Sequence, residues 1–431
     1  MLSGKLIQKL IEKHRVSNLP RFEKLERYYK NENNILGRKM KDASKPNNKV
    51  AHPYAEYISD VLTAYFMGEG VNYSSSGNEC DVLIPILNYN DSQDEDMELA
   101  KDCSIYGLGI ELLYIDADGM ERFKRISPKE CVLVYDTTIE EELLYGIRYY
   151  TEKDILTDDE NVIIEVYSRN DVAKYKCNNQ FNGMTEISRE EHYFGLVPVV
   201  VYINNEECSG DFEKVISLID AYDLMESESL NNQQYFSDAY LTITGMTLDE
   251  DTVGNMKENR VMLLDEGCDA KWLIKDENDV LVENIKNRLD NDIHKFSKVP
   301  NMSDKEFSSN SSGVAIKYKT MALENLAAIK ERKFKKGLQR RIELIFNTLG
   351  LKGDKMDWRA IDIAFKRNLP TNETEIANMV NQLRGLVSEE TLVAQIPFVD
   401  DVIGEVERLQ AEKEKNMSLY NFPLMEEEDE E

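Results

Sequence analysis

The residue types that most often carry catalysis occur in this chain, but their spacing does not form a reactive site. The four histidines are His14, His52, His192 and His294. None has partners at metal-ligand spacing, and a lone histidine is more often structural than catalytic. No Gly-x-x-x-x-Gly-Lys-Ser/Thr loop is present to hold nucleotide phosphates, and Gly107-Leu-Gly109 is too short a signal for a dinucleotide site. We therefore expect no catalytic residue, no cofactor and no enzyme activity.

Two acidic clusters, 91–98 and 249–251, have the residue types that hold paired Mg²⁺ ions in nucleases. A chain this acidic produces such clusters by chance, so a solvated face is the stronger hypothesis for both. The Asp116-Ala-Asp118-Gly119 stretch resembles the start of a calcium loop, but it lacks the Gly at position six and the Glu at position twelve. We interpret it as the turn of a β-hairpin and predict no metal site.

A polar loop that leads directly into a long helix is the most informative local pattern. Residues 301–313 are rich in Ser and Asn and end in Gly, a composition that favours a mobile, solvated segment. Apolar residues then recur at steps of three and four: Val314, Tyr318, Met321, Phe334, Leu338, Ile342, Ile345 and Leu349. This spacing predicts one buried face of a long helix with a mobile, hydrogen-bonding segment at its start.

Charge is distributed unevenly along the 431 residues. The chain has a formal net charge of -29, yet residues 1–49 hold 13 Lys and Arg against 5 Asp and Glu, a net charge of +8. The remainder therefore carries a net charge of -37. Such a body repels free polyanions and is a poor candidate for an ordinary DNA-binding surface, although DNA could pass it without adhering.

Cysteine usage and hydropathy place further limits on the protein. Six cysteines lie far apart without a Cys-x-x-Cys pair, so we expect reduced thiols in a cytoplasmic setting, most of them as small core residues. No run reaches the roughly 18 apolar residues of a membrane span, and no signal peptide is recognised. We expect no membrane role.

Helix and strand signals together predict an α+β protein. Residues 2–30 indicate two short amphipathic helices broken at Pro20, and 50–66 a helix followed by a strand at 71–74. Residues 103–201 change to antiparallel β structure. The predicted strands are 110–115, 121–126, 131–135, 144–150, 162–168, 172–176 and 197–202.

Two long helices enclose a small insertion. Residues 211–240 predict a helix of roughly 45 Å, and an apolar seam at 282–296 predicts a second that ends at Pro300. Between them, strand-like runs at 241–244, 260–264 and 271–274 surround a predicted helix at 249–257. A helical region at 371–415, capped at Thr371 or Asn372, precedes a solvated run of six acids at the end.

One basic cluster lies within the long helix. It comprises Lys330, Arg332, Lys333, Lys335, Lys336, Arg340 and Arg341. We interpret it as a solvated or salt-bridged face that meets acids of a neighbouring subunit, in preference to a DNA contact. For the basic N-terminal segment these two interpretations stay equally open.

Several of these strings resemble the portal proteins of tailed bacteriophages, of the kind found in siphoviruses of Gram-positive hosts. The resemblance covers roughly 30–350. It rests on Asn47-Asn-Lys-Val-Ala-His-Pro-Tyr54, Tyr65-Phe-Met-Gly68, Tyr106-Gly-Leu-Gly109, Ser127-Pro128, Tyr135-Asp136 and Ile147-Arg-Tyr-Tyr150. Its strongest parts are Phe307-Ser-Ser-Asn-Ser-Ser-Gly313-Val-Ala-Ile-Lys-Tyr318 and Glu331-Arg-Lys-Phe-Lys-Lys-Gly337. Gly70 stands where many relatives have proline, which leaves the local turn open.

The resemblance implies an α+β ring subunit with a defined division. It implies a basic helical segment at 1–49, a wing of helix and antiparallel β structure at 50–210, and stem helices at 211–240 and 277–299. A small α/β clip would occupy 241–276, a tunnel loop 300–313, a long wing helix 314–350, a mainly helical crown 351–415 and a disordered acidic tail 416–431. Rings of this family are typically dodecamers around a DNA channel.

The resemblance also implies sites and partners. Tunnel-loop residues expected to contact DNA are Lys305, Phe307, Ser308, Ser309, Asn310 and Ser311. Clip residues expected to meet partners are Thr244, Asp249, Asp251, Lys257 and Arg260. The implied partners are identical subunits, double-stranded DNA in the channel, the terminase motor, head-completion or adaptor proteins, and the major capsid and scaffolding proteins. The expected location is the portal vertex of the virion, after assembly in the host cytoplasm.

Two alternatives stay open from sequence. A ring-forming minor capsid or adaptor protein would share the helices without conducting DNA, and the insertion between two long helices favours a portal over it. A metal-dependent nuclease would use the acidic clusters, but no spacing in the sequence requires that function.

Overall fold

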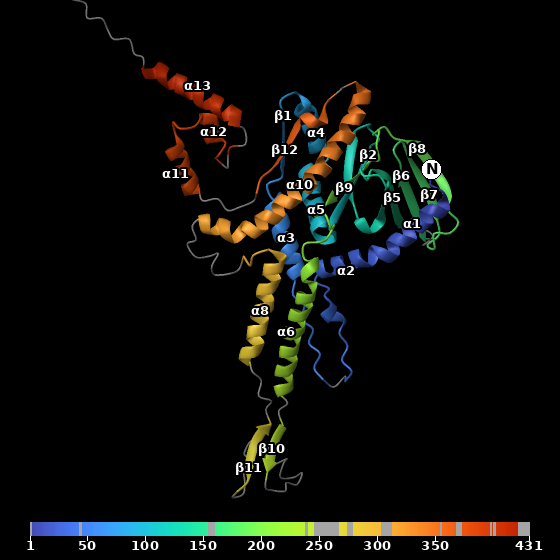
Figure 1. Cartoon of the computed structure of the whole chain (residues 1–431), viewed down its shortest axis with the longest axis vertical. Coiled ribbons are helices and arrows are strands. Elements are labelled where there is room, and N and C mark those ends of the chain that lie inside the picture. Colours follow the sequence, from blue (N-terminus) through green and yellow to red (C-terminus); the bar gives the residue numbers. More distant parts are fainter. Residues whose placement is uncertain are drawn as a thin grey trace, which may run out of the picture. The chain divides into compact units, whose positions relative to one another are not determined.

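The computed structural model describes residues 2–42, 45–153, 160–237, 240–244, 267–273, 279–302, 313–353, 356–367, 373–396, 399 and 402–420. The chain divides into two compact units. The first comprises Met1–Ser308 and Tyr318–Asn368, and the second Ser309–Lys317 and Leu369–Glu431. Helices and strands both contribute, in agreement with the predicted α+β class (Figure 1). Among the described residues, no helix has the length and apolar character needed to cross a membrane.

Two amphipathic helices open the first unit, as predicted. They are α1 (Gly4–Ser17) and α2 (Leu19–Tyr29). The break lies at Asn18, and Pro20 sits in the first turn of α2, where a missing N–H removes no helical hydrogen bond. The predicted break at Pro20 was therefore wrong by two residues. Ile7 and Ile11 of α1 are buried against Ile147 and Ile164 of a β-sheet.

The β-rich region forms two antiparallel sheets. One has the order β4-β5-β6-β7-β8 and the other β3-β2-β9. Their strands are β2 (Leu108–Ile115), β3 (Glu121–Ile126), β4 (Cys131–Tyr135), β5 (Leu143–Lys153), β6 (Glu160–Tyr167), β7 (Asp171–Cys177), β8 (Thr185–Glu191) and β9 (Val199–Ile203). Of these eight strands, only β8 lacked a prediction, because its mostly polar sequence shows little apolar alternation. Ile110, Cys131 and Val199 are buried in one cluster between the two sheets.

The turn that joins β2 and β3 confirms the hairpin interpretation of 116–119. Ile115 pairs with Glu121 across the turn, and Gly119 has a backbone φ of 78°, which residues with a Cβ rarely adopt. The Asp116 carboxylate accepts the N–H groups of Asp118 and Met120 at 3.0 and 2.9 Å. This carboxylate therefore stabilises the turn.

The long helix α10 (Gly313–Lys352) forms the centre of the largest core, but only part of its predicted face is buried. Phe334, Leu338, Ile342, Ile345 and Leu349 are all buried, as expected. Tyr318 and Met321 are 74% and 57% exposed, whereas Leu323 and Ala327 are fully buried. The prediction was wrong for the first turns because a helix of 40 residues meets different neighbours along its length, so its buried stripe need not continue unchanged.

Helices and strands distant in sequence complete this core. They include α3 (Tyr54–Met67), α4 (Glu79–Tyr89) and α5 (Ser92–Tyr106), and the paired strands β1 (Val71–Ser75) and β12 (Ile361–Phe365). The predicted helix at 50–66 begins only after Pro53, which stands at its N-cap. Phe66 stacks on Phe365 with their ring centroids 5.3 Å apart. Cys103, Cys131 and Cys177 are buried, while the other three cysteines are half-buried.

The acidic cluster 91–98 is not simply a solvated face. In α5, Asp96 is 2% exposed and accepts a 2.5 Å hydrogen bond from Arg341, which is fully buried in α10. Glu111 accepts two further bonds from Arg341 at 2.6 and 2.9 Å. Burial raises the pKa of both carboxyl groups, and the guanidinium opposes that rise. Arg341 therefore belongs to the core of its own chain, contrary to the predicted contact with a neighbouring subunit.

Other cations of α10 also pair within the chain. Lys330 contacts Asp211 and Lys333 contacts Glu206, while Arg340 pairs with Glu343 one turn away at 2.8 Å. The prediction of a salt-bridged face was right for these residues, but the acids belong to the same subunit. The first two pairs tie the helix to the segment that follows β9.

Two antiparallel helices extend from the core and carry a short ribbon. Figure 1 shows α6 (Ile216–Ser237) beside α8 (Asp279–Ser297), and Lys286 of α8 lies 3.2 Å from Glu226 of α6. Beyond them, β10 (Tyr240–Thr244) pairs with β11 (Asp269–Leu273). Both helices and both strands were predicted, while the predicted strand 260–264 and helix 249–257 lie outside the described residues.

The described residues of the second unit include three helices besides the start of α10. They are α11 (Glu373–Leu383), α12 (Glu389–Val393) and α13 (Val402–Tyr420). The Ser388 hydroxyl caps α12 by accepting the Thr391 N–H at 3.3 Å, and Lys413 of α13 pairs with Glu389. The region predicted as helical is thus interrupted, and the predicted caps Thr371 and Asn372 lie outside the described residues.

Candidate functional site

The predicted tunnel-loop residues lie outside the described residues, between 302 and 313. These are Lys305, Phe307, Ser308, Ser309, Asn310 and Ser311. Among the predicted clip residues, Asp249, Asp251, Lys257 and Arg260 likewise lie outside the described residues. Thr244 is described: it is the last residue of β10 and lies opposite Asp269 of β11.

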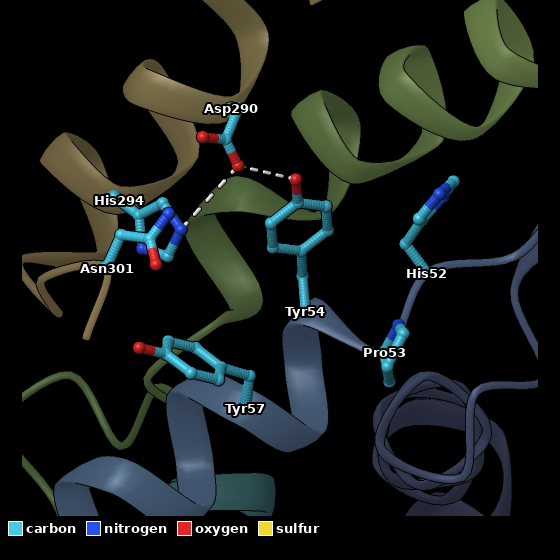
Figure 2. Close-up of a pocket in the computed structure, with 7 residues that line it drawn as sticks. All are labelled: His52, Pro53, Tyr54, Tyr57, Asp290, His294 and Asn301. Atoms are coloured by element: carbon cyan, nitrogen blue, oxygen red, sulfur yellow. Dashed lines mark hydrogen bonds and ion pairs between the residues drawn. The ribbon is translucent and has the colours of Figure 1, made fainter. Parts of the chain in front are cut away.

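The structure instead presents a group of interacting side chains where the two long helices meet α3. We call it the junction. A cavity of about 230 Å³ lies there, and Figure 2 shows its lining residues: His52, Pro53, Tyr54, Tyr57, Asp290, His294 and Asn301. They come from the segment before α3, from α3 itself, from α8 and from the chain just after it. The junction thus joins the helical pair to the core and to residues 299–302.

Asp290 links α8 to α3 through a phenol. The Tyr54 hydroxyl donates to Asp290 Oδ1 at 2.6 Å, and His294 Nε2 lies 3.6 Å from the same oxygen (Figure 2). Burial raises the pKa of Tyr54 well above its ordinary value, and the hydrogen bond to the Asp290 carboxylate adds to this rise. Tyr54 therefore stays a neutral donor.

Tyr57 holds the chain just after α8. Its hydroxyl donates to the Pro300 carbonyl at 3.0 Å and accepts the Met302 N–H at 2.8 Å. The Tyr57 ring also meets the His294 ring edge-on, with the centroids 5.6 Å apart. One side chain of α3 thus fixes both the direction and the backbone hydrogen bonding of residues 300–302.

The C-terminal end of α8 is fixed by its own polar groups. His294 Nδ1 donates to the Val299 carbonyl at 2.9 Å, and the Ser297 hydroxyl accepts the Val299 N–H at 3.3 Å. Lys298 has a φ of 63°, the left-handed conformation that commonly ends a helix. His294 therefore faces Asp290 on the preceding turn of α8 and also Val299 just after the helix.

A polar face of α6 anchors the N-terminal segment beside the junction. Asp223 is fully buried and accepts hydrogen bonds from Asn33 Nδ2 at 2.6 Å, His52 N at 3.0 Å and His52 Nδ1 at 2.8 Å. One turn further, the Ser227 hydroxyl accepts the Val50 N–H at 3.0 Å. The resembling stretch 47–54 is therefore the segment that connects α6 to α3.

These geometries position segments of the chain relative to one another. His294 Nδ1 faces the Val299 carbonyl, and Nε2 lies 3.6 Å from an Asp290 carboxylate oxygen. Within the described parts of the chain, no group of three or more metal-ligating residues is found. All four histidines form hydrogen bonds with other residues of the chain.

Sequence reasoning did not find the junction. Its members lie at 52–57, 223, 290–294 and 299–302, so no local spacing links them. The only signal was that two histidines stand next to apolar helical patterns, and burial alone explains that position. Pairing these positions requires knowing that α6 and α8 turn back onto α3.

The family model and the similar proteins all indicate one family. The sequence model of the family described as "Phage portal protein, SPP1 Gp6-like" matches residues 8–419. The portal protein of Bacillus phage SPP1 is 25% identical, over 94% of this chain and 86% of its own length. The portal protein of Clostridium phage phiCD119 is 23% identical, over 90% of this chain and 91% of its own length.

Proposed function

This chain belongs to the SPP1 Gp6-like family of phage portal proteins, and from that premise we propose how its parts serve a portal. The subunits would assemble into a closed ring, typically a dodecamer, at one vertex of the capsid. Double-stranded DNA would enter and leave through the central channel. The observation that most supports this proposal is the antiparallel pair α6 and α8. The pair carries the β10–β11 ribbon at one end, and at the other end Tyr57 binds the chain that follows α8.

The helices and strands can each be assigned to one part of such a ring subunit. In our proposal α6 and α8 are the stem, and the region from β10 to β11 belongs to the clip. The two β-sheets with α3 to α5 form the wing, α10 is its long helix, and α11 to α13 form the crown. Residues 300–313 would be the tunnel loop, and the junction is then its anchor on the stem.

The junction would hold the loop relative to the stem. Asp290 and His294 belong to α8, while Tyr54 and Tyr57 belong to α3, so a tilt of α8 changes the contacts of residues 299–302 directly. Such a connection between a helix and a loop would let the channel adjust as DNA moves through it. Lys305, Ser308, Ser309, Asn310 and Ser311 would then make brief contacts with the DNA backbone that carry no sequence information.

The chemistry of transport would be passive. A separate ATPase, the terminase, would supply the energy and dock on the clip, where Thr244, Asp249, Asp251, Lys257 and Arg260 lie in sequence. Outside residues 1–49 the chain has a net charge of -37, so its walls would not retain DNA. Each neutralised phosphate would add salt-dependent affinity and slow movement. Head-completion, capsid and scaffolding proteins would be the remaining partners.

The test is to image the purified protein by single-particle electron microscopy and to measure its mass. A closed ring with a channel about as wide as duplex DNA is expected. A variant with Ser308, Ser309, Asn310 and Ser311 replaced by Gly should assemble normally and package less nuclease-protected DNA. A monomer that cleaves DNA with Mg²⁺ would refute the proposed function, and loop variants that fail to form rings would refute the loop assignment.

A further inference from the structure

A basic segment lies along the acidic helical pair. We call residues 38–42 and 45–49 the basic arm, which Figure 1 shows in blue beside α6. Its charged residues are Arg38, Lys39, Lys41, Asp42, Lys45 and Lys49, a net charge of +4. The portal proposal assigns no role to this arm.

Several hydrogen bonds hold the arm in place. Arg38 Nη1 pairs with Glu228 of α6 at 2.5 Å, and the Asn48 N–H donates to Asn231 Oδ1 at 2.7 Å. Lys49 Nζ donates to the Leu36 carbonyl at 2.8 Å. Asn231 is buried, so the arm covers a polar stripe of α6. The backbone of the arm is therefore fixed at both ends.

The remaining lysines of the arm point their charge to solvent. Lys39, Lys41 and Lys45 are exposed, and in the described part of the chain no carboxylate lies within ion-pair distance of them. Arg38, by contrast, has Glu228 as its partner. Three exposed lysines without an ion-pair partner among the described residues are suited to an acidic partner.

The helical pair itself is acidic. Helix α6 has four acids and no Lys or Arg, and α8 has four acids and three Lys and Arg, which gives the pair a net charge of -5. Copies of such a pair placed side by side repel one another. A ring of stems would bring them side by side, so a cation between neighbours would stabilise it.

The arm lies on a suitable side of α6. Asn48 of the arm contacts Asn231, and Val50 just after the arm contacts Ser227 on the same face. Helix α8 contacts a different face of α6 through Glu226. A ring contact joins two different faces of identical subunits. The arm of one copy can thus face the α8 side of the next. Free DNA is the weaker candidate partner, because the surrounding body is strongly acidic.

We propose that the basic arm is an intersubunit contact, in which Lys39, Lys41 and Lys45 bind the acidic helical pair of the adjacent subunit. The proposal rests on the ring of the proposed function. It predicts that ring assembly depends on the charge of the arm and that this dependence weakens in salt, because exposed ion pairs are screened.

The test compares two triple variants of the full chain. In the first, Lys39, Lys41 and Lys45 are replaced by Glu; in the matched control, Lys5, Lys9 and Lys13 of α1 are replaced by Glu, with the same change in net charge. Mass photometry over a protein dilution series gives the concentration at which rings form. We expect this concentration to rise about tenfold for the arm variant at low salt, the effect of a few exposed ion pairs. The control should stay near wild type.

Each outcome is decisive. An arm variant that forms rings at the wild-type concentration overturns the inference, as does an equal loss in the control. Normal rings with weaker binding of a duplex DNA probe would overturn it in favour of phosphate contacts. Partial recovery of assembly on adding Glu283→Lys in α8 would support the proposed partner. If wild-type protein forms no rings at all, the proposed function fails first, so the two failures are distinguishable.

Discussion

Replacing Tyr57 by Phe tests whether the junction holds the exit from α8. The substitution removes only the hydroxyl that donates to the Pro300 carbonyl and accepts the Met302 N–H. The ring, and with it the edge-on contact with His294, remains. Any effect is therefore assigned to the two hydrogen bonds.

The magnitude follows from those two bonds. A hydrogen bond contributes about 0.5–1.5 kcal/mol net, so local opening of residues 300–302 should become easier by about 1–3 kcal/mol. Since about 1.4 kcal/mol corresponds to a factor of ten, amide exchange at Met302 should accelerate by roughly fivefold to 150-fold. Global stability should change much less, because the affected segment lies at the edge of the core.

Hydrogen exchange followed by mass spectrometry measures this on assembled protein. The matched control is Tyr193→Phe, which removes a hydroxyl from a side chain that is 61% exposed. Exchange at Met302 within twofold of wild type would refute the assigned role of Tyr57. A similar acceleration in the control would show that the effect is not local.

Three further outcomes follow from the packing and charges of the core. Arg341→Met should lower the free energy of unfolding in urea by roughly 3–5 kcal/mol, because it leaves buried carboxylates without their cation; a loss below about 1 kcal/mol would contradict the network. Gly337→Ala should cost about 1–3 kcal/mol on thermal unfolding, since its Cβ would lie 2.3 Å from Tyr202 Cδ1; an unchanged melting temperature would argue against that close approach. Burial opposes ionisation of Glu213, but the hydrogen bonds from Arg21 and a backbone N–H outweigh it and lower the pKa. The stability it contributes is therefore present above its ordinary value of 4.5 and is lost as the pH falls through the lowered value, so Glu213→Gln should flatten the acid side of the stability profile.

Local patterns were sufficient to predict most helices and strands. The hairpin at 116–119 was predicted because Asp-Gly favours the backbone angles of a tight turn, and the structure confirms it at Gly119. The helical pair followed from apolar steps of three and four, which depend only on the geometry of one helix. The resemblance to portal proteins, carried by short strings within 30–350, also came from sequence alone and is now supported by family membership.

Tertiary structure alone decided which residues meet. β1 pairs with β12, nearly 300 residues away, and Tyr54 meets Asp290 across a similar separation. Periodicity indicates which residues share a face of a helix, but it does not say which neighbour covers that face or where the neighbour ends. Tyr318 is exposed and Ala327 buried on the same helix for that reason.

Charge shows the same division. The sequence determined that the chain is strongly acidic with a basic start and a basic stretch in its long helix. It did not determine that Arg341 is buried between Asp96 and Glu111, whereas Lys39 and Lys41 are exposed. A cation is buried only where the fold brings carboxylates and hydrogen-bond acceptors around it to offset the loss of water. That arrangement depends on the packing of α10 against α5 and β2, which no local pattern encodes.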